Sequence, residues 1–217
     1  MADIINAQYD ITKKSKLKIF YDSNKILIYT SLLVIIILFS SFTYYQINKE
    51  NKKIMLSENY VNAKIQLGNG NKSEALIMLK KIIYENDPTY STLCFFLILD
   101  QELISDHNEI LDIFNHVLNN NKFDKEIKNL LIYKKALFSS NYVNESELLN
   151  NLSPILKGKE DSAWKPQALL LLGDYFVSKN EHVKATEFYL QILSTKNLQE
   201  GLYAHARSQL ALINNEQ

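Results

Sequence analysis

Residues 166–199 read PQALLLLGDYFVSKNEHVKATEFYLQILSTKNLQ, two apolar segments that flank a short polar stretch. Each segment repeats its apolar side chains at helical spacing and has the length of a globular helix. Lys179, Asn180 and Glu181 form the break between them, which is short enough to join two antiparallel helices. The stretch therefore predicts a helical hairpin.

Small and aromatic residues occupy fixed positions in this hairpin. Gly173 and Ala185 are small where two paired helices would cross closely, and Phe176 and Tyr189 would fill the gaps beside them. Leu172 precedes the glycine, which completes an L-G-x2-aromatic, small, aromatic pattern over 34 residues. This pattern is typical of a tetratricopeptide repeat. These five residues are the predicted packing signature of the pair.

A weaker match to the same pattern occupies residues 56–88. Ala63 and Ala75 take the two small positions, again twelve residues apart, and Leu79 replaces the second aromatic residue. Gly70 lies in the turn. We therefore predict a first, less regular pair here, with Ala63 and Ala75 as its packing signature.

After residue 45, the rest of the chain repeats the helical spacing of apolar residues but lacks the pattern of small and aromatic residues. Residues 89–118 and 123–156 have the length of degenerate pairs, and residues 201–213 would form a final capping helix. Only 5 Gly and 3 Pro occur, too few for an all-β chain. We predict an all-α fold with eight or nine helices arranged as an α-solenoid of degenerate tetratricopeptide-like pairs. The predicted breaks between helices are residues 68–71, 85–88, 105–108, 119–122, 139–141, 157–161, 178–180 and 194–197.

An uncharged stretch, ILIYTSLLVIIILFSSFTYY, fills residues 26–45. Twenty helical residues span about 30 Å, the thickness of a bilayer's hydrocarbon core. Tyr29, Tyr44 and Tyr45 lie near its ends, where aromatic rings favour the headgroup level. We predict a single transmembrane helix over residues 26–45, between an N-terminal tail (1–25) and a helical-repeat domain (46–217).

Two alternatives to a membrane anchor are a buried core helix and a cleaved signal peptide. Soluble helices rarely run so far without a charge. The apolar run also exceeds a usual signal-peptide core, and no small-x-small cleavage site follows it. Lysines flank both ends of the stretch, so the positive-inside rule favours a cytoplasmic N-terminus only slightly. These lysines are Lys13, Lys14, Lys16, Lys18 and Lys25 before it, and Lys49, Lys52, Lys53 and Lys64 after it.

Motifs for catalysis or cofactor binding do not occur in the sequence. None of the four histidines has another ligand at metal-binding spacing, and each is expected at a surface or a helix cap. The 24 basic and 24 acidic side chains balance, which argues against nucleic-acid binding. Cys94 lies among apolar residues and is expected to be a buried thiol. We therefore predict a protein-binding function without an enzyme activity, a metal, a cofactor or a small-molecule substrate.

Stacked helix pairs leave a concave surface lined by the first helix of each pair, which suits an extended chain or a helix. In the better-matched pair the first helix would present four side chains to this groove, and in the first pair it would present three. Packing against the neighbouring helix is an equal alternative for all seven. The candidates are Gln167, Leu170, Asp174 and Val177, followed by Tyr60, Lys64 and Leu67.

The order of these parts resembles the YfgM-like ancillary subunits of the bacterial SecYEG translocon. The likeness is strongest over residues 164–193 (WKPQALLLLGDYFVSKNEHVKATEFYLQIL) and includes the closing run QLALINN at residues 209–215. Residues 60–79 fit less closely. The resemblance extends over most of the chain, although its motifs are mainly general repeat features.

The resemblance implies a bacterial inner-membrane protein with a cytoplasmic N-terminus and a periplasmic repeat domain. It also implies association with translocon subunits, with a periplasmic chaperone and with nascent secreted chains. A membrane-tethered scaffold or assembly factor for another envelope or organelle complex has the same architecture and is the alternative.

Overall fold

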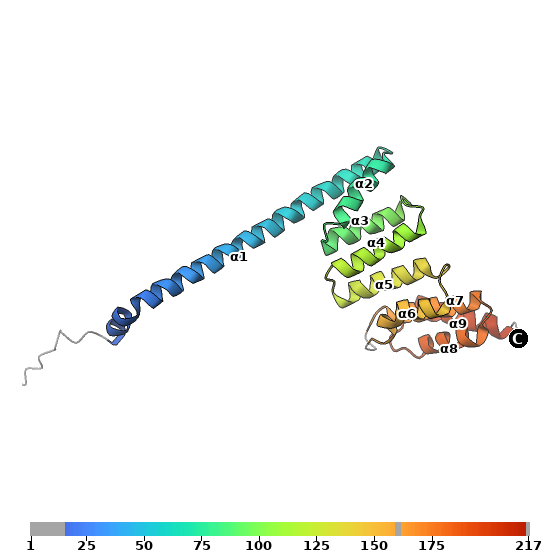
Figure 1. Ribbon diagram of the computed structural model, residues 1–217. Helices are drawn as coiled ribbons and strands as arrows, with labels where there is room; N and C mark the ends of the chain where they lie inside the picture. Colours follow the sequence, from blue (N-terminus) through green and yellow to red (C-terminus); the bar gives the residue numbers. More distant parts are fainter. Residues whose placement is uncertain (1–15, 159–161, 216–217) are drawn as a thin grey trace, which may run out of the picture. The chain divides into compact units, whose positions relative to one another are not determined.

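The computed structural model describes residues 16–158 and 162–215, and every regular element in these ranges is an α-helix (Figure 1). The prediction of an all-α fold is therefore confirmed for the described part of the chain. The helices are α1 (Lys16–Gly68), α2 (Lys72–Ile83), α3 (Pro88–Asp100), α4 (His107–Asn120), α5 (Lys125–Ser139), α6 (Glu145–Leu156), α7 (Lys165–Ser178), α8 (His182–Leu193) and α9 (Glu200–Asn215).

All eight predicted breaks fall at or beside helix ends, with two differences in position. α3 already ends at Asp100, before the break predicted at 105–108, and α5 starts only at Lys125, after the break predicted at 119–122. Apolar side chains outside the helices explain both differences. Ile104 is buried in the loop before α4, and Phe123 packs against the same core before α5. The apolar residues at these two positions therefore reflect side chains buried in loops rather than helical structure.

α1 continues without interruption past the predicted end of the membrane anchor. None of residues 26–45 is buried, and the helix is long and apolar enough, by length and composition, to cross a membrane. Of the predicted tail, residues 16–25 belong to α1, while residues 1–15 lie outside the described residues. The chain divides into two compact units, Met1–Met55 and Leu56–Gln217.

Three helices of the second unit begin after a residue whose side chain caps the helix N-terminus. Asp87 precedes α3 and accepts hydrogen bonds from the backbone N–H groups of Thr89 and Tyr90, both 3.0 Å long. Asp106 and Asn144 accept equivalent bonds at the starts of α4 and α6. Each cap satisfies donors that the first helical turn leaves unpaired, so the local sequence sets where these helices begin.

Left-handed backbone follows the ends of several helices. Gly70, after α1, has φ +82°, which glycine adopts without steric cost. Glu102, after α3, has φ 48°, and the next residue's N–H bonds back to the Ile98 carbonyl at 3.0 Å. This bond closes the helix end at the expense of a strained, non-glycine residue. The other described non-glycine residues with positive φ are Asn86, Asn180 and Asn197.

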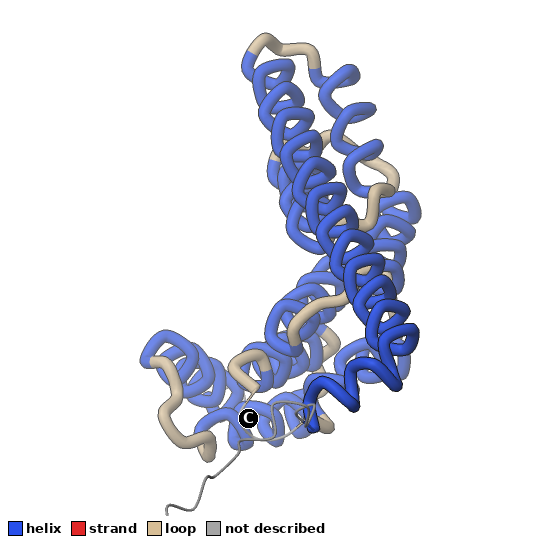
Figure 2. The backbone as a smooth tube through the Cα atoms, turned by 90° about the vertical axis from the view of Figure 1, so that its left-hand side faces the viewer, coloured by secondary structure: helices blue, strands red, loops and turns tan. Residues whose placement is uncertain are grey.

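Buried side chains of the second unit form two hydrophobic clusters. The first, which we call the N-terminal core, runs from Leu56 to Leu131, and the second, the C-terminal core, runs from Ala136 to Ile213. α5 contributes to both clusters, so it joins them. From α2 onward each helix packs against the next one along the chain. Figure 2 shows the described helices with the short loops that join them. The core is thus built mostly from neighbours in sequence.

The same spacing of buried residues recurs in four consecutive helix pairs. In each pair the first helix buries one residue, and the second helix buries another twelve positions later in the sequence. The second helix then buries two more, four and seven positions further on. The first two positions are held by Ala63 and Ala75, Ile98 and Ile110, Ala136 and Leu148, and Gly173 and Ala185. The later two are held by Leu79 and Ile82, Phe114 and Val117, Leu152 and Ile155, and Tyr189 and Ile192.

Candidate functional site

The seven residues of the predicted packing signature are all buried. Gly173 on α7 lies directly against the ring of Tyr189 on α8. A Cβ atom at this glycine would lie 2.5 Å from Cε1 of Tyr189 and within 2.9 Å of two further ring atoms. The contact therefore requires glycine. The full set is Ala63, Ala75, Leu172, Gly173, Phe176, Ala185 and Tyr189.

Asp174, the residue after this glycine, connects three helices. Its Oδ1 atom accepts a hydrogen bond of 2.7 Å from the Tyr189 hydroxyl and lies 3.1 Å from Nε2 of His205 on α9. Burial, with help from the Asp174 carboxylate, raises the pKa of Tyr189, so its hydroxyl stays protonated and donates. The side chains of Asp174 and His205 remain 44% and 43% exposed. The carboxylate is thus anchored but accessible to solvent.

Two aromatic residues pack together where α5 meets the start of α7. Tyr133 on α5 stacks against Trp164, which caps the start of α7, with ring centroids 5.7 Å apart. Both rings are half-buried. Burial raises the pKa of Tyr133, and the negative charge of Asp174 raises it further, so the carboxylate acts across the packed α5–α7 seam.

The predicted groove positions on α7 have intermediate exposure. Gln167, Leu170, Asp174 and Val177 are all half-buried. Leu170 and Val177 also pack against the C-terminal core, so core packing accounts for part of their surface. The Oε1 atom of Gln167 is buried and accepts no hydrogen bond from the described residues. These four side chains follow one another along a single helix, as the sequence predicted.

The three groove candidates on α1 form a separate group. Tyr60 and Leu67 are half-buried against the N-terminal core, whereas Lys64 is exposed. The Lys64 Nζ atom lies 5.9 Å from the centre of the Tyr60 ring, and Tyr60 also contacts Tyr90 at 6.4 Å between centroids. This group therefore combines an aromatic ring with a cation, whereas the group on α7 carries the carboxylate of Asp174.

The sequence argument did not single out three residues that make these contacts: Tyr133, Trp164 and His205. His205 was expected only at a surface or cap, yet it contacts a carboxylate 31 residues earlier in the chain. No local spacing reports such a contact. Trp164 had a weak sequence signal, because a large aromatic residue stands directly before the Lys165–Pro166 helix start.

A hollow of about 570 Å³ lies among α3, α4 and α5. Ile110 and Phe114 form part of its apolar lining, while Lys134 and Glu102 contribute charges. His107 lies beside it, with its ring 4.7 Å from the Phe138 ring. The α3–α4 loop builds part of this wall, so helix patterns in the sequence did not predict it.

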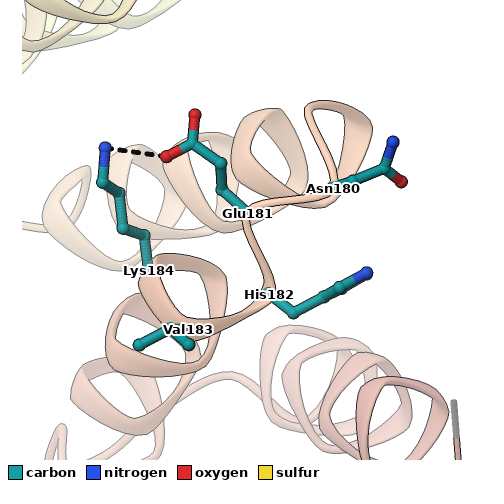
Figure 3. Close-up of a pocket in the computed structure, with 5 residues that line it drawn as sticks. All are labelled: Asn180, Glu181, His182, Val183 and Lys184. Carbon is teal, nitrogen blue, oxygen red and sulfur yellow. Dashed lines mark ion pairs between the residues drawn. The ribbon is translucent and has the colours of Figure 1, made fainter. Parts of the chain in front are cut away.

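The turn between α7 and α8 forms another open hollow, lined by the five successive residues Asn180 to Lys184 (Figure 3). Glu181 pairs with Lys184 at 2.7 Å, and Lys184 also reaches Glu145 on α6 at 2.8 Å. Hydrogen bonds to Glu145 and then to Glu181 raise the pKa of Lys184 to about 12. These contacts join α6 to α8, so the charged residues at this turn stabilise the packing of the two helices.

Cys94 is fully buried on α3, and burial raises the pKa of its thiol to about 12. The thiol is therefore protonated at neutral pH and is shielded from solvent, so it is a packing residue rather than a nucleophile. Among the described residues, no group of three His, Cys, Asp or Glu side chains could hold a metal ion.

Comparison of the chain with models of known protein families, with curated proteins and with solved structures gives no match.

Proposed function

We propose that this chain is a membrane-anchored protein-binding module, in which residues 46–217 form degenerate tetratricopeptide-like pairs behind a single transmembrane helix. The observation that carries the proposal is the spacing of buried residues, repeated in four consecutive helix pairs. Such repetition is the signature of stacked repeats, whose first helices line a shared binding surface.

The surface of α7 supports a binding role. Partly exposed Gln167, Leu170, Asp174 and Val177 combine apolar area with polar groups. Interfaces of this kind gain affinity from apolar burial and orientation from a few polar contacts. The role requires no catalytic residue, cofactor, small-molecule substrate or nucleic acid.

The order of an apolar helix followed by helix pairs supports a more specific proposal. In it, the protein is an ancillary component of the Sec translocon in a bacterial inner membrane. Its N-terminus lies in the cytoplasm and its repeats lie in the periplasm. Its partners are translocon subunits, a periplasmic chaperone and nascent secreted chains.

A topology reporter tests this arrangement first. Alkaline phosphatase fused after Gln217 is active only outside the cytoplasm, so we expect full phosphatase activity from this fusion and none from a fusion before Met1. An inactive phosphatase at Gln217, in a fusion protein that is present in the membrane fraction, would contradict the periplasmic proposal. That result would favour the alternative of a tethered assembly factor facing the cytoplasm.

Affinity purification from detergent-solubilised membranes tests the partners. We expect the full chain to recover translocon subunits together with a periplasmic chaperone. The matched control is a chain that keeps residues 1–55 and lacks the second unit, which should lose the chaperone. Equal recovery by both chains would show that the helix pairs bind nothing, and would overturn the proposed function.

A further inference from the structure

We propose that the hollow among α3, α4 and α5 binds an extended polypeptide segment. In this segment a leucine-sized side chain enters the hollow, a basic side chain pairs with Glu102, and an acidic side chain pairs with Lys134. The inference rests on the proposed protein-binding function and specifies the chemistry of a partner at one surface.

The interior of this hollow is apolar, and the elements around it pack together. α4 lies between α3 and α5 and packs against both of them (Figure 1). Its buried residues Ile110 and Phe114 line the hollow, together with Ile104 from the α3–α4 loop. Leu137 on α5 also lines it and remains 42% exposed, so the hollow is open to solvent at this side. Its volume of about 570 Å³ is within the range of ligand pockets.

Two opposite charges line the hollow from different elements. Glu102 lies in the α3–α4 loop and Lys134 lies on α5, and neither has an ion-pair partner in the part of the chain that the structure describes. Neighbouring acidic groups are engaged elsewhere, since Asp106 caps α4 and Glu109 pairs with a lysine of α2. Lys135, the next residue on α5, does not line the hollow. An occupant with an apolar centre and one charge of each sign therefore complements this site.

Glu102 occupies a backbone position that glycine or asparagine would fill with less strain. Its φ is 48°, and the hydrogen bond from the Leu103 N–H to the Ile98 carbonyl closes the end of α3 around it. Every other described residue with positive φ is an asparagine or a glycine. Strained residues cluster at binding and catalytic sites, where the unusual conformation serves the site. The strain is thus a second, independent observation that assigns Glu102 to a binding surface.

The placement of the charges favours a polypeptide over a free amino acid. A free amino acid carries both of its charges on one carbon atom, whereas Glu102 and Lys134 belong to different elements around the hollow. In an extended segment alternate side chains share a face, so the residues two positions before and after the apolar one point the same way. A basic, an apolar and an acidic residue at alternate positions therefore match the carboxylate, the hollow and the ammonium group.

Photo-crosslinking tests the site in the full chain, held in phosphatidylcholine nanodiscs. The probes are acetyl-Lys-Ser-photoleucine-Ser-Glu-amide and its reversed sequence, which cover both directions of the segment. The matched probe has glutamine at both charged positions. Each probe is titrated and irradiated, and the attached residues are identified by mass spectrometry. We expect saturable attachment within residues 99–114 and 134–138 from at least one charged probe, and at least about fivefold weaker binding of the glutamine probe.

Matched variants of exposed residues test the separate contacts without disturbing the core. Leu137→Gln should weaken binding of the charged probe about fivefold, whereas Leu190→Gln, at an exposed leucine of α8, should leave it unchanged. Lys134→Gln should also weaken binding about fivefold. Its control is Lys128→Gln, which removes an exposed charge elsewhere on α5.

Glu102→Gly separates binding from stability, because glycine relieves the left-handed strain but removes the carboxylate. We expect this variant to be at least as stable as the wild type and to bind the charged probe about fivefold more weakly. A structural role alone would leave binding intact.

Three results would each overturn the inference: equal affinity for the charged and glutamine probes, attachment mainly outside the hollow, or unchanged binding in Glu102→Gly. Displacement of the probe by an equal concentration of free leucine would also overturn it and would assign the hollow to a small zwitterion. Recovery of translocon subunits and chaperone by the full chain is measured separately, so the broader function can stand if this site fails.

Discussion

The helix pairs α7/α8 and α3/α4 bury the same two register positions with side chains of opposite size. Gly173 and Ala185 occupy them in α7/α8, and Ile98 and Ile110 occupy them in α3/α4. Among helices α2 to α9, α7 and α8 share the most extensive contact, whereas α3 and α4 share only a small one. Small side chains let two backbones approach, and large ones hold them apart while filling the space between.

The comparison teaches that the pairs share burial at these positions rather than residue identity or side-chain size. Where the first position is glycine, the second helix supplies the large ring of Tyr189. Where it is isoleucine, the equivalent position on the second helix carries Phe114, which packs edge-on against Phe95 with ring centroids 4.5 Å apart. Both solutions leave the position inaccessible to solvent. Four predictions, in order of decreasing effect, can break or sharpen this comparison.

Ile98→Ala should cost the most, about 3 kcal/mol of unfolding free energy. The bulky neighbours that hold α3 and α4 apart prevent the two helices from closing the cavity. Chemical denaturation of the full chain in detergent, followed by circular dichroism, measures the loss. A cost below about 1 kcal/mol would mean that α3 and α4 can close like α7 and α8, and the comparison would fail.

Gly173→Ala should cost about 2 kcal/mol because the new methyl group meets the Tyr189 ring at 2.5 Å. Combining it with Tyr189→Leu recreates the alanine–leucine combination of Ala63 and Leu79, so the double variant should lose less than the sum of the single variants. Gly201→Ala is the control, since nothing lies within 4 Å of its added methyl group. Strict additivity would show that the ring is not what requires glycine.

Tyr189→Phe should cost about 1 kcal/mol, since it removes the hydroxyl that donates to Asp174. The half-exposed carboxylate can take water instead, which limits the loss. Urea denaturation monitored by Trp164 fluorescence gives the value. A loss of several kcal/mol would indicate that the Asp174 hydrogen bond, rather than volume, keeps α7 and α8 together.

Glu102→Gly should raise stability by about 0.5 kcal/mol, because relief of the left-handed strain exceeds the extra backbone entropy that glycine loses. Asn180→Gly, at the corresponding turn of α7/α8, should gain less, since asparagine tolerates this conformation. Thermal unfolding of the two variants compares them. A larger gain at Asn180 would reverse the expected ranking.

The sequence predicted the helices and their boundaries well because both depend on local chemistry. Polar breaks and capping residues mark helix ends over a few positions, and Asp87 before Pro88 is one such signal that the structure uses. Gly173 and Ala185 also stood out, since small residues at a fixed spacing have few other uses. The middle pairs did not stand out, because Ile98, Ile110 and Leu148 are ordinary apolar residues whose equivalence to Gly173 and Ala185 only burial reveals.

By itself, the sequence determined the all-α fold seen in residues 16–158 and 162–215, one uncharged stretch long enough to cross a bilayer, and a close helix crossing at Gly173. Periodicity, charge and side-chain size are properties of short segments, so they can be read without a fold. The tertiary structure alone decided that Asp174 meets Tyr189 and His205, and that Tyr133 stacks on Trp164 across α5 and α7. Those contacts join residues from different helices, and their distances depend on how the helices pack against one another.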